Sequence, residues 1–225
     1  MSKKKFNLVV VAHPDDETIF FAGAILAQPH IHWQVALVTD GNADKNGEER
    51  IAQFRSACRA LGVKKLHLFN MPDIYSKRLN PDQISHHFDQ IETPQSVYTH
   101  GPLGEYGHPH HQDVSFAVHR HYRKLKIISP AYNCEADEII KLSTKNYRKK
   151  CHILAKIYFD ETKRFSHFLP SHSIEGYTSY SFKEVQTLYR FFTSDSPIKI
   201  NSLNKLKWFA PYLHGYKKIA NNRSF

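Results

Sequence analysis

Short apolar runs alternate with helical patterns four times within the first 126 residues. The four apolar runs are residues 6–12, 33–39, 66–69 and 95–99. The helical segments after them are residues 17–28, 48–61, 81–92 and 109–126. Continuous apolar runs of this length are typical of strands buried on both faces of a parallel sheet. The alternation therefore predicts an α/β fold: a doubly wound, Rossmann-like and mostly parallel sheet with helices on both faces.

Two polar clusters stand where expected strands end, which is where open α/β sheets bind their ligands. His13-Pro-Asp-Asp-Glu17 comes directly after the first apolar run, and Tyr106-Gly-His-Pro-His-His111 lies between the fourth run and its helix. Imidazole and carboxylate groups are ligands that suit zinc or ferrous iron. A carboxylate that is close to the metal but not bound to it can serve as a general base. The clusters therefore predict a hydrolytic metal site.

Spacing alone leaves other interpretations open. The chain has 16 histidines, so any one of them can be a packed or surface residue. Asp15, Asp16 and Glu17 precede the first expected helix, where the helix dipole favours negative charge. A helix cap, however, needs no histidines at a neighbouring strand end. A dinucleotide-binding enzyme is disfavoured, because no GxGxxG motif comes after the first apolar run.

The string Ala12-His-Pro-Asp-Asp-Glu17, with the later Gly104-Glu-Tyr-Gly-His-Pro-His-His111, resembles the LmbE-like (PIG-L) family of zinc-dependent N-deacetylases. That family removes acetyl groups from N-acetylglucosamine-type sugars, including the glycolipid of GPI-anchor synthesis and the mycothiol and bacillithiol precursors. The resemblance covers roughly residues 6–125 and includes Thr39-Asp-Gly41, Arg50 and Leu61-Gly62. It implies that the chain is a hydrolase of N-acetylated amino sugars or their conjugates, with Zn²⁺ as cofactor or Fe²⁺ in its place.

The resemblance also implies a metal centre and a base. His13, Asp16 and His111 match the family's zinc ligands. Asp15 matches the carboxylate that acts as general base when metal-activated water attacks the amide carbonyl. The expected helix from Pro109 carries His111 on the face of Val114 and Val118, which points this ligand inward.

Four further residues match positions around the reacting group. His108 matches a histidine that, when protonated, helps to neutralise the tetrahedral oxyanion, and Tyr106 matches a tyrosine that assists the same step. Arg50 and Asp73 fall where family members contact the sugar or its phosphate.

Two residues depart from the family's pattern. His110 stands where the family often has Asp, and Gln53 stands where a Glu commonly comes after the arginine. Both lie outside the implied ligand set. The departures therefore bear on ligand orientation and substrate choice, and not on the metal itself.

The second half of the chain carries all of the surplus positive charge. Residues 1–112 hold 11 basic and 12 acidic side chains, whereas residues 113–225 hold 20 basic and 9 acidic ones. We expect residues 1–130 to form a Rossmann-like catalytic core with the metal site. Residues 131–225, with one helix over 144–164, are expected to complete the same domain and to line the substrate site. The charge fits an N-acetylated sugar that is phosphate-, nucleotide- or lipid-linked.

An alternative interpretation of the charge is a basic nucleic-acid- or anionic-membrane-binding protein without hydrolase activity. Residues 205–218 mix lysines and aromatics as a peripheral membrane segment does, although Pro211 and Gly215 interrupt any helix there. No RNP, zinc-finger or helix-turn-helix pattern is present, so nucleic acid is not an expected partner.

The location is inferred from features that the sequence lacks. No apolar run approaches the roughly 20 residues that span a bilayer, and the three cysteines form no CxxC pair. The apolar stretch after Lys5 lacks the small-residue cleavage site of a secretory signal. We therefore expect a cytoplasmic protein, and the sequence leaves open whether it is an oligomer.

Overall fold

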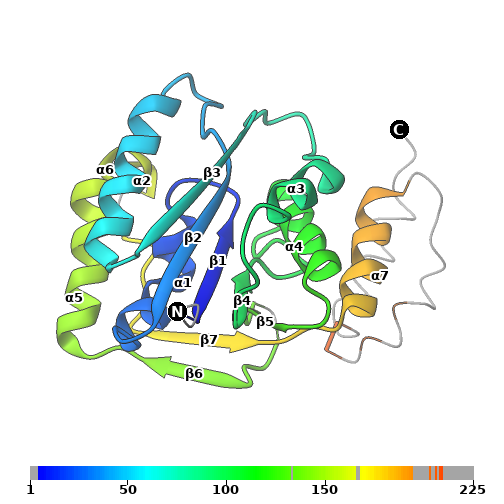
Figure 1. The fold of residues 1–225 in the computed structure, drawn as a ribbon. Coiled ribbons are helices and arrows are strands. Elements are labelled where there is room, and N and C mark those ends of the chain that lie inside the picture. The colour runs from blue at the N-terminus through cyan, green and yellow to red at the C-terminus, as the bar shows by residue number, and fades with distance from the viewer. Residues whose placement is uncertain are drawn as a thin grey trace.

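The computed structural model describes residues 5–132, 134–165 and 168–194, together with Leu203, Leu206, Trp208 and Phe209. Within this part of the chain, seven strands form one sheet in the order β3-β2-β1-β4-β5-β7-β6 (Figure 1). The strands are β1 (Phe6–Val11), β2 (His32–Thr39), β3 (Lys65–Met71), β4 (Ser96–Thr99), β5 (Lys126–Pro130), β6 (Glu138–Lys141) and β7 (Ile174–Thr178).

The five strands from β3 to β5 are parallel, and β7 and β6 are antiparallel to their neighbours. The strand order reverses between β1 and β4, as in a doubly wound sheet. The predicted fold class is thereby confirmed. The α-helices are α1 (Asp16–Ala27), α2 (Gly47–Leu61), α3 (Pro81–Phe88), α4 (Pro109–His121), α5 (Thr144–His152), α6 (Phe159–Thr162) and α7 (Phe182–Thr193).

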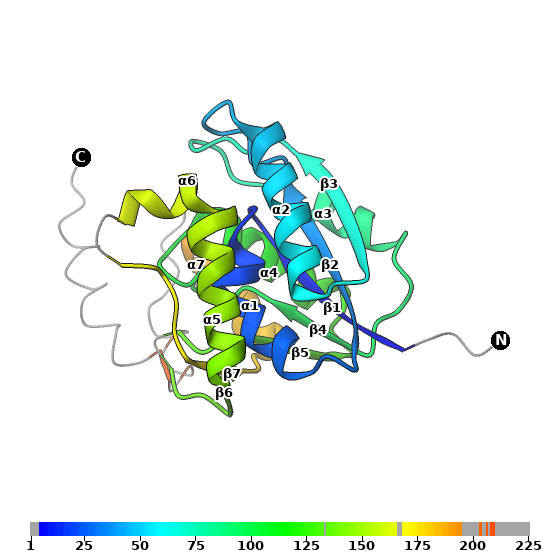
Figure 2. The same ribbon diagram turned by 90° about the vertical axis from the view of Figure 1, so that its left-hand side faces the viewer.

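Each face of the sheet packs against its own layer of helices. On β1, Val9 and Val11 join the core beneath α1 and α2, whereas Leu8 and Val10 join the core beneath α3 and α4. Figures 1 and 2 show α2 and α5 on one side of the strands and α3 and α4 on the other. Apolar residues on both faces explain why the strand is a continuous apolar run without polar alternation.

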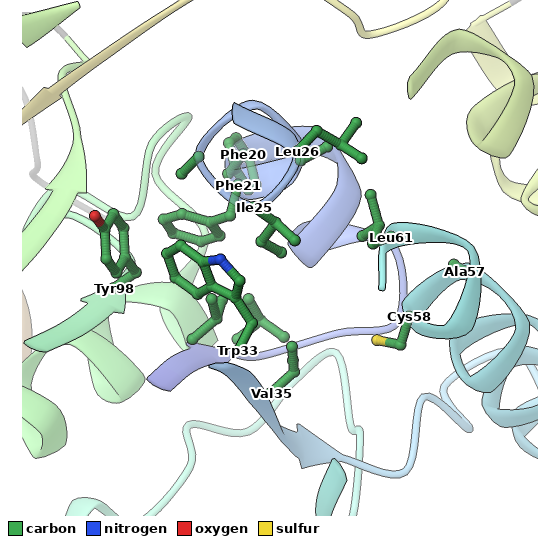
Figure 3. Packing of buried hydrophobic residues seen from close by; sticks show 14 of the residues in the cluster. Phe20, Phe21, Ile25, Leu26, Trp33, Val35, Ala57, Cys58, Leu61 and Tyr98 are labelled. Carbon is green, nitrogen blue, oxygen red and sulfur yellow. The ribbon is translucent and has the colours of Figure 1, made fainter. Parts of the chain in front are cut away.

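Aromatic side chains fill the first of these cores. Figure 3 shows the indole of Trp33 beside Phe21 and Tyr98, with Ile25 of α1 above it. The Trp33 and Tyr98 rings meet edge to face with centroids 5.0 Å apart. The indole N–H donates to the carbonyl of Gln28 at 3.2 Å, so this fully buried side chain leaves no polar atom unpaired. The core therefore fixes α1 over the start of β2.

The prediction of a single helix over residues 144–164 is wrong. Here α5 passes into a π-helical turn at Ile153–Ile157, after which come α6 and the short 3₁₀ turn Lys163–Phe165. The π turn closes where the N–H of Tyr158 donates to the carbonyl of Ile153 at 3.1 Å. One such turn inserts an extra residue and rotates the helical residues beyond it, and π turns occur frequently at functional sites. Two other expected helices end early, at Phe88 and His121.

A buried ion pair joins the later elements to α1. Lys150 Nζ of α5 lies 2.7 Å from Glu175 Oε1 of β7, and both side chains are buried. The N–H of Gly23 in α1 donates to the same oxygen at 2.9 Å. A Cβ at Gly23 would lie only 2.2 Å from the other carboxylate oxygen, so the helix can approach this closely only with glycine at that position.

Helix α7 covers the outer side of α4. The ring of Tyr189 stacks on Phe116 with centroids 4.2 Å apart, and its hydroxyl donates to Asp113 Oδ1 at 2.9 Å. Most of the proposed membrane segment, residues 205–218, lies outside the described residues. No described helix combines the length and the apolar character that crossing a bilayer requires.

Candidate metal centre

Both polar clusters lie at one edge of the sheet. Residues 12–15 connect β1 to α1, and residues 100–108 connect β4 to α4. Strands β1 and β4 are parallel neighbours, so their carboxyl ends lie side by side. This is the point at which the strand order reverses, where doubly wound sheets bind ligands. The fold therefore brings the two clusters together.

His13, Asp16 and His111 surround a common point. His13 Nδ1 lies 3.3 Å from His111 Nε2 and 3.4 Å from Asp16 Oδ2, and His111 Nε2 lies 3.4 Å from the same carboxylate oxygen. All three side chains are buried. Ligand atoms about 2.05 Å from a tetrahedral zinc lie roughly 3.3 Å from one another. The donor types and their spacing both fit a zinc ion with an open fourth position.

Glu105, a buried carboxylate not predicted from the sequence, supports His111. Glu105 Oε2 accepts a hydrogen bond from His111 Nδ1 at 2.6 Å and another from His100 Nδ1 at 3.0 Å. Glu105 Oε1 accepts from the N–H of Gly101 at 2.8 Å. The N–H of Ala12 donates to His100 Nε2, which fixes the Nδ1–H tautomer of neutral His100. A Glu close before the histidine cluster was the only sequence signal for this support.

The centre is built to hold positive charge. Burial raises the pKa of Asp16, but His111 and His100 outweigh it and hold that pKa well below its usual range. Glu105 behaves in the same way, with a pKa of about 2. Burial lowers the pKa of His111, yet the charges of Asp16 and Glu105 raise it to about 10. The carboxylates of Asp16 and Glu105 thus favour one cationic partner between them, which can be a proton or a metal ion.

Asp15 has a strained backbone beside this centre. Its φ of 121° and ψ of −32° are rarely adopted by residues other than glycine. Its side chain makes no capping hydrogen bond to α1, so the helix-cap interpretation does not account for it. Instead the carboxylate lines a cavity, with Oδ2 3.8 Å from Arg50 Nη2 and 3.9 Å from Arg164 Nη2. Strain of this kind is found at active sites.

The ionisation of Asp15 depends on its neighbours. Burial raises the pKa of its carboxyl well above the usual range, the negative charge of Asp16 raises it further, and Arg50 opposes both. A divalent cation bound by Asp16 would neutralise that charge and lower the pKa of Asp15 again. Metal binding and formation of a basic Asp15 are therefore coupled.

Glu17 holds the Asp15 turn from behind. Its Oε2 accepts from the N–H of Asp15 at 3.2 Å, and its Oε1 accepts from the hydroxyls of Thr18 at 2.5 Å and Tyr158 at 2.9 Å. Burial raises the pKa of Glu17 to about 7. Tyr158 comes directly after the π turn, so the irregular helix places its hydroxyl against the first polar cluster. Neither Glu17 nor Tyr158 was assigned a role from the sequence.

The rings of His108 and Tyr106 lie beside that of the candidate ligand His111. The N–H of His110 donates to His108 Nδ1 at 3.2 Å, so the neutral ring carries its proton on Nε2. Burial and the neighbouring imidazoles lower the pKa of His108 to about 3, whereas the family resemblance led us to expect a protonated side chain. The Tyr106 ring is 5.4 Å from that of His111 and its side chain is 67% exposed. Both residues can donate hydrogen bonds as neutral groups.

Arg50 binds mainly to the protein itself. Its Nη1 and Nη2 donate to the carbonyls of Gly41 at 3.2 Å and Pro14 at 3.0 Å. Its Nε lies 3.0 Å from Glu161 Oε1, an ion pair without hydrogen-bond alignment. Asp73, the second expected sugar contact, has Oδ2 3.8 Å from Arg50 Nη1. The structure therefore brings both residues to the metal centre and adds Glu161 from α6.

A cavity of about 560 Å³ opens over these groups, a size typical of small-molecule sites. We call its buried polar residues the floor and its exposed residues the rim. The floor consists of His13, Asp15, Asp16, Arg50, Asp73 and Glu161. The rim consists of Asp44, Tyr75, Tyr106, Tyr132 and Arg164. His108 is half-buried between them.

Sequence comparisons relate this chain to sugar deacetylases. The family model described as PIG-L, GlcNAc-PI de-N-acetylase, matches residues 8–122. N-acetylglucosaminyl-phosphatidylinositol de-N-acetylase from Bos taurus is 31% identical over 122 residues, which are 50% of this chain and 48% of that protein. A 1D-myo-inositol 2-acetamido-2-deoxy-alpha-D-glucopyranoside deacetylase from Saccharopolyspora erythraea is 28% identical over 148 residues, 46% of this chain and 49% of its own. The chain thus spans about half the length of the curated relatives it matches.

A solved structure shares the fold. The N,N'-diacetylchitobiose deacetylase from Pyrococcus horikoshii superposes with a TM-score of 0.57, covering 85% of this chain and 87% of its own, at 16% sequence identity. At that identity the likeness concerns the arrangement of helices and strands. It extends well beyond residues 8–122 and so includes elements of the second half.

Proposed function

The chain belongs to the PIG-L (LmbE-like) family, and from this premise we propose that it is a zinc-dependent N-deacetylase of an N-acetylated amino sugar or sugar conjugate. The observation that carries the proposal is the group His13, Asp16 and His111, whose donor atoms have zinc-ligand spacing beneath a cavity. The names of the relatives from Bos taurus and Saccharopolyspora erythraea support this class of reaction.

The proposed mechanism uses Asp15 to move a proton. Zinc, when bound, supplies a Lewis acid that polarises the amide carbonyl and makes water more acidic. Asp15 accepts a proton from the attacking water, and the same carboxyl then protonates the leaving amine. Its strained turn, held by Glu17, keeps the carboxylate facing the cavity. The donor set also suits ferrous iron, so the identity of the metal is part of the proposal.

His108 and Tyr106 stabilise the negative charge that develops on the amide oxygen. Neutral His108 offers its Nε2–H and Tyr106 offers its hydroxyl, both beside the ligand His111. Fixed donors of this kind stabilise a tetrahedral oxyanion without reorganisation during the reaction. A protonated His108 is not needed for this role.

The substrate we propose is an N-acetylhexosamine that carries a phosphate-, nucleotide- or lipid-linked group. The sugar would meet Arg50 and Asp73 at the floor and the ring of Tyr75 at the rim. Arg164 is the cationic side chain of the rim, so a linked phosphate would be bound beside it. The bovine relative's name, which includes phosphatidylinositol, supports such a conjugate.

Two expectations stay predictions, namely the division at residue 130 and a cytoplasmic location. The sequence left the oligomeric state open and gave binding of residues 205–218 to anionic membranes only as an alternative. Nucleic-acid or membrane binding without hydrolysis, the alternative function, has no observation in the described residues that favours it over the metal centre.

Metal analysis combined with acetate release tests the proposed function. Protein purified without chelator is analysed for zinc and iron and incubated with free, nucleotide-linked and lipid-linked N-acetylhexosamines. We expect about one metal ion per chain and acetate release from at least one substrate. Absence of both metal and turnover would overturn the proposal.

A further inference from the structure

His110 connects a proposed metal ligand to the backbone of the connection between β3 and α3. Its Nδ1 lies 3.1 Å from His13 Nε2, the ring nitrogen that faces away from His111. Its Nε2 lies 2.8 Å from the carbonyl oxygen of Lys77. Both imidazoles are buried, and their rings stack with centroids 5.3 Å apart.

The hydrogen-bond chemistry of these contacts fixes where the protons are. A carbonyl oxygen only accepts, so His110 Nε2 carries a proton and donates it to Lys77. A neutral imidazole with its proton on Nε2 has a lone pair on Nδ1. His13 Nε2 must then be the donor in the 3.1 Å contact. His13 Nδ1 is consequently left with its lone pair, on the side where Asp16 and His111 lie.

We propose that His110 is a positioning residue that holds His13 in the tautomer required for metal binding. The chain of donors runs from His13 Nε2–H to His110 Nδ1, and from His110 Nε2–H to the Lys77 carbonyl. This inference rests on the proposed metal centre. A ligating histidine generally donates its other ring N–H to an acceptor that sets ring orientation and tautomer.

The two ligating histidines are supported by acceptors of different kinds. Behind His111 stands the ionised Glu105, whereas behind His13 stands a neutral ring. Asp73 Oδ1 lies 3.5 Å from His110 Nδ1 and 3.7 Å from His13 Nε2, so negative charge is close to the pair without replacing the hydrogen bond. With His in place of the Asp that the family often has here, residue 110 still offers an acceptor to His13. It also donates a hydrogen bond to the Lys77 carbonyl.

A measurement of zinc affinity tests the proposed effect of His110 on His13 directly and needs no substrate. We would compare wild type, His110→Phe and His110→Asp by competition with a chromophoric chelator. His110→Phe removes the acceptor and is expected to bind zinc about 10- to 100-fold more weakly, the usual loss when such a partner is removed. His110→Asp restores an acceptor and is expected to bind within about threefold of wild type or more tightly.

His119→Phe is the matched control. His119 is also buried in α4, where its Nδ1 donates to the carbonyl of Ser115 at 2.7 Å, and it is not among the residues that line the cavity. The control reports the effect on the fold of losing a buried α4 histidine. If its thermal midpoint falls as far as that of His110→Phe while its zinc affinity stays at the wild-type value, the affinity loss belongs to position 110.

Nitrogen-15 chemical shifts of the histidine rings report the tautomer in the metal-free protein. This measurement is therefore informative even if the proposed function is wrong. We expect His13 to carry its proton on Nε2 in wild type and to lose that preference in His110→Phe. A proton on His13 Nδ1 in wild type would overturn the inference. Equal zinc affinity in wild type and His110→Phe would overturn it as well. Binding of two zinc ions by wild type and of one by His110→Phe would also overturn it.

Discussion

The floor and the rim of the cavity differ in burial and in anchoring. Each floor residue is less than 10% exposed and contacts other floor or core groups, whereas Tyr75 and Tyr106 at the rim are about two-thirds exposed. Floor residues such as His13 and Asp16 stand next to the end of β1, whereas the rim residues other than Arg164 stand on connections. A rigid floor suits chemistry that needs fixed geometry, and an exposed rim suits selection of the substrate. Floor variants should therefore change kcat, metal content or both, and rim variants should change KM.

The strongest test of this division is Asp15→Asn. The amide cannot accept the proton from water, so kcat is expected to fall about 10³-fold, within the range of general-base catalysis. Zinc content should stay at the wild-type level, because Asp15 is outside the ligand group. Acetate release and metal analysis on one preparation check both points.

Asp44→Asn is the rim control for this prediction. Asp44 also lines the cavity, but its carboxylate accepts a hydrogen bond from the exposed Tyr75 hydroxyl at 2.8 Å. We expect kcat to change less than about threefold, since the pair is exposed. Loss of zinc in Asp15→Asn would contradict the assignment of the base, and equal kcat losses in both variants would contradict the division itself.

Tyr106→Phe is the most severe test of the difference between floor and rim, because this exposed residue lies beside the proposed ligand His111. Loss of one oxyanion donor is expected to lower kcat about 10- to 100-fold with little change in KM, somewhat less than for buried donors. Steady-state kinetics with a soluble substrate measure both constants. A rise in KM alone would make Tyr106 a substrate contact.

Arg164→Gln tests the rim as a site for a linked phosphate. The guanidinium is 56% exposed and lies 3.7 Å from Glu161, so its contribution to binding is that of a screened surface charge. KM for a phosphate-linked substrate should rise about fivefold while kcat stays constant. The free sugar should bind equally to both proteins, and an equal rise in KM for the free sugar would contradict a phosphate contact.

A variant of His119 distinguishes unfolding at acid pH from loss of activity at acid pH. Burial lowers the pKa of His119 to about 4, although the Ser115 carbonyl and Glu184 oppose the shift. The unfolded chain takes up this proton at a higher pH than the folded chain, so stability falls as pH falls from about 6.5 to 4. The loss attributable to this group is about 3 kcal/mol.

Urea unfolding of wild type and His119→Gln at pH 7 and pH 4 measures that difference. The variant should lose about 3 kcal/mol less than wild type over this range, while its acetate release at pH 7 is unchanged. Equal losses in both proteins would show that groups nearer the cavity dominate acid unfolding.

The sequence was sufficient for strands β1 to β4 and the helices between them, because continuous apolar runs and helix periods report burial on both faces. The fifth parallel strand, β5, was missed, because the helix from Pro109 was expected to run to residue 126, where β5 begins. The sequence was also not sufficient for the helix after Thr144, where the pattern is helical throughout. The π turn there is accompanied by a tertiary contact between residues far apart in sequence, the hydrogen bond from the Tyr158 hydroxyl to Glu17. Likewise β7 pairs with β5 and β6 over long sequence separations, and its Glu175 forms an ion pair with Lys150 of α5, 25 positions away.

The same limit holds at the site. The two clusters were visible because unusual residue types stood at expected strand ends. Glu161 was missed, since a single carboxylate in a helix has no distinguishing neighbours in sequence. Glu105 stands beside the second cluster, but it was given no role because its hydrogen bond to His111 is visible only in the fold. Arg50 was expected to contact sugar, and only the structure reveals how many protein groups its guanidinium meets.

The most direct test of a zinc-dependent deacetylase is to remove and restore the metal. Chelator-treated protein is titrated with zinc while acetate release from an N-acetylated sugar conjugate is monitored. We predict no turnover in the metal-free protein and recovery that saturates at about one zinc per chain, with Asp15→Asn binding the same zinc and remaining inactive. Turnover that is independent of zinc, or a zinc-loaded wild type that releases no acetate from any conjugate, would contradict the proposed function.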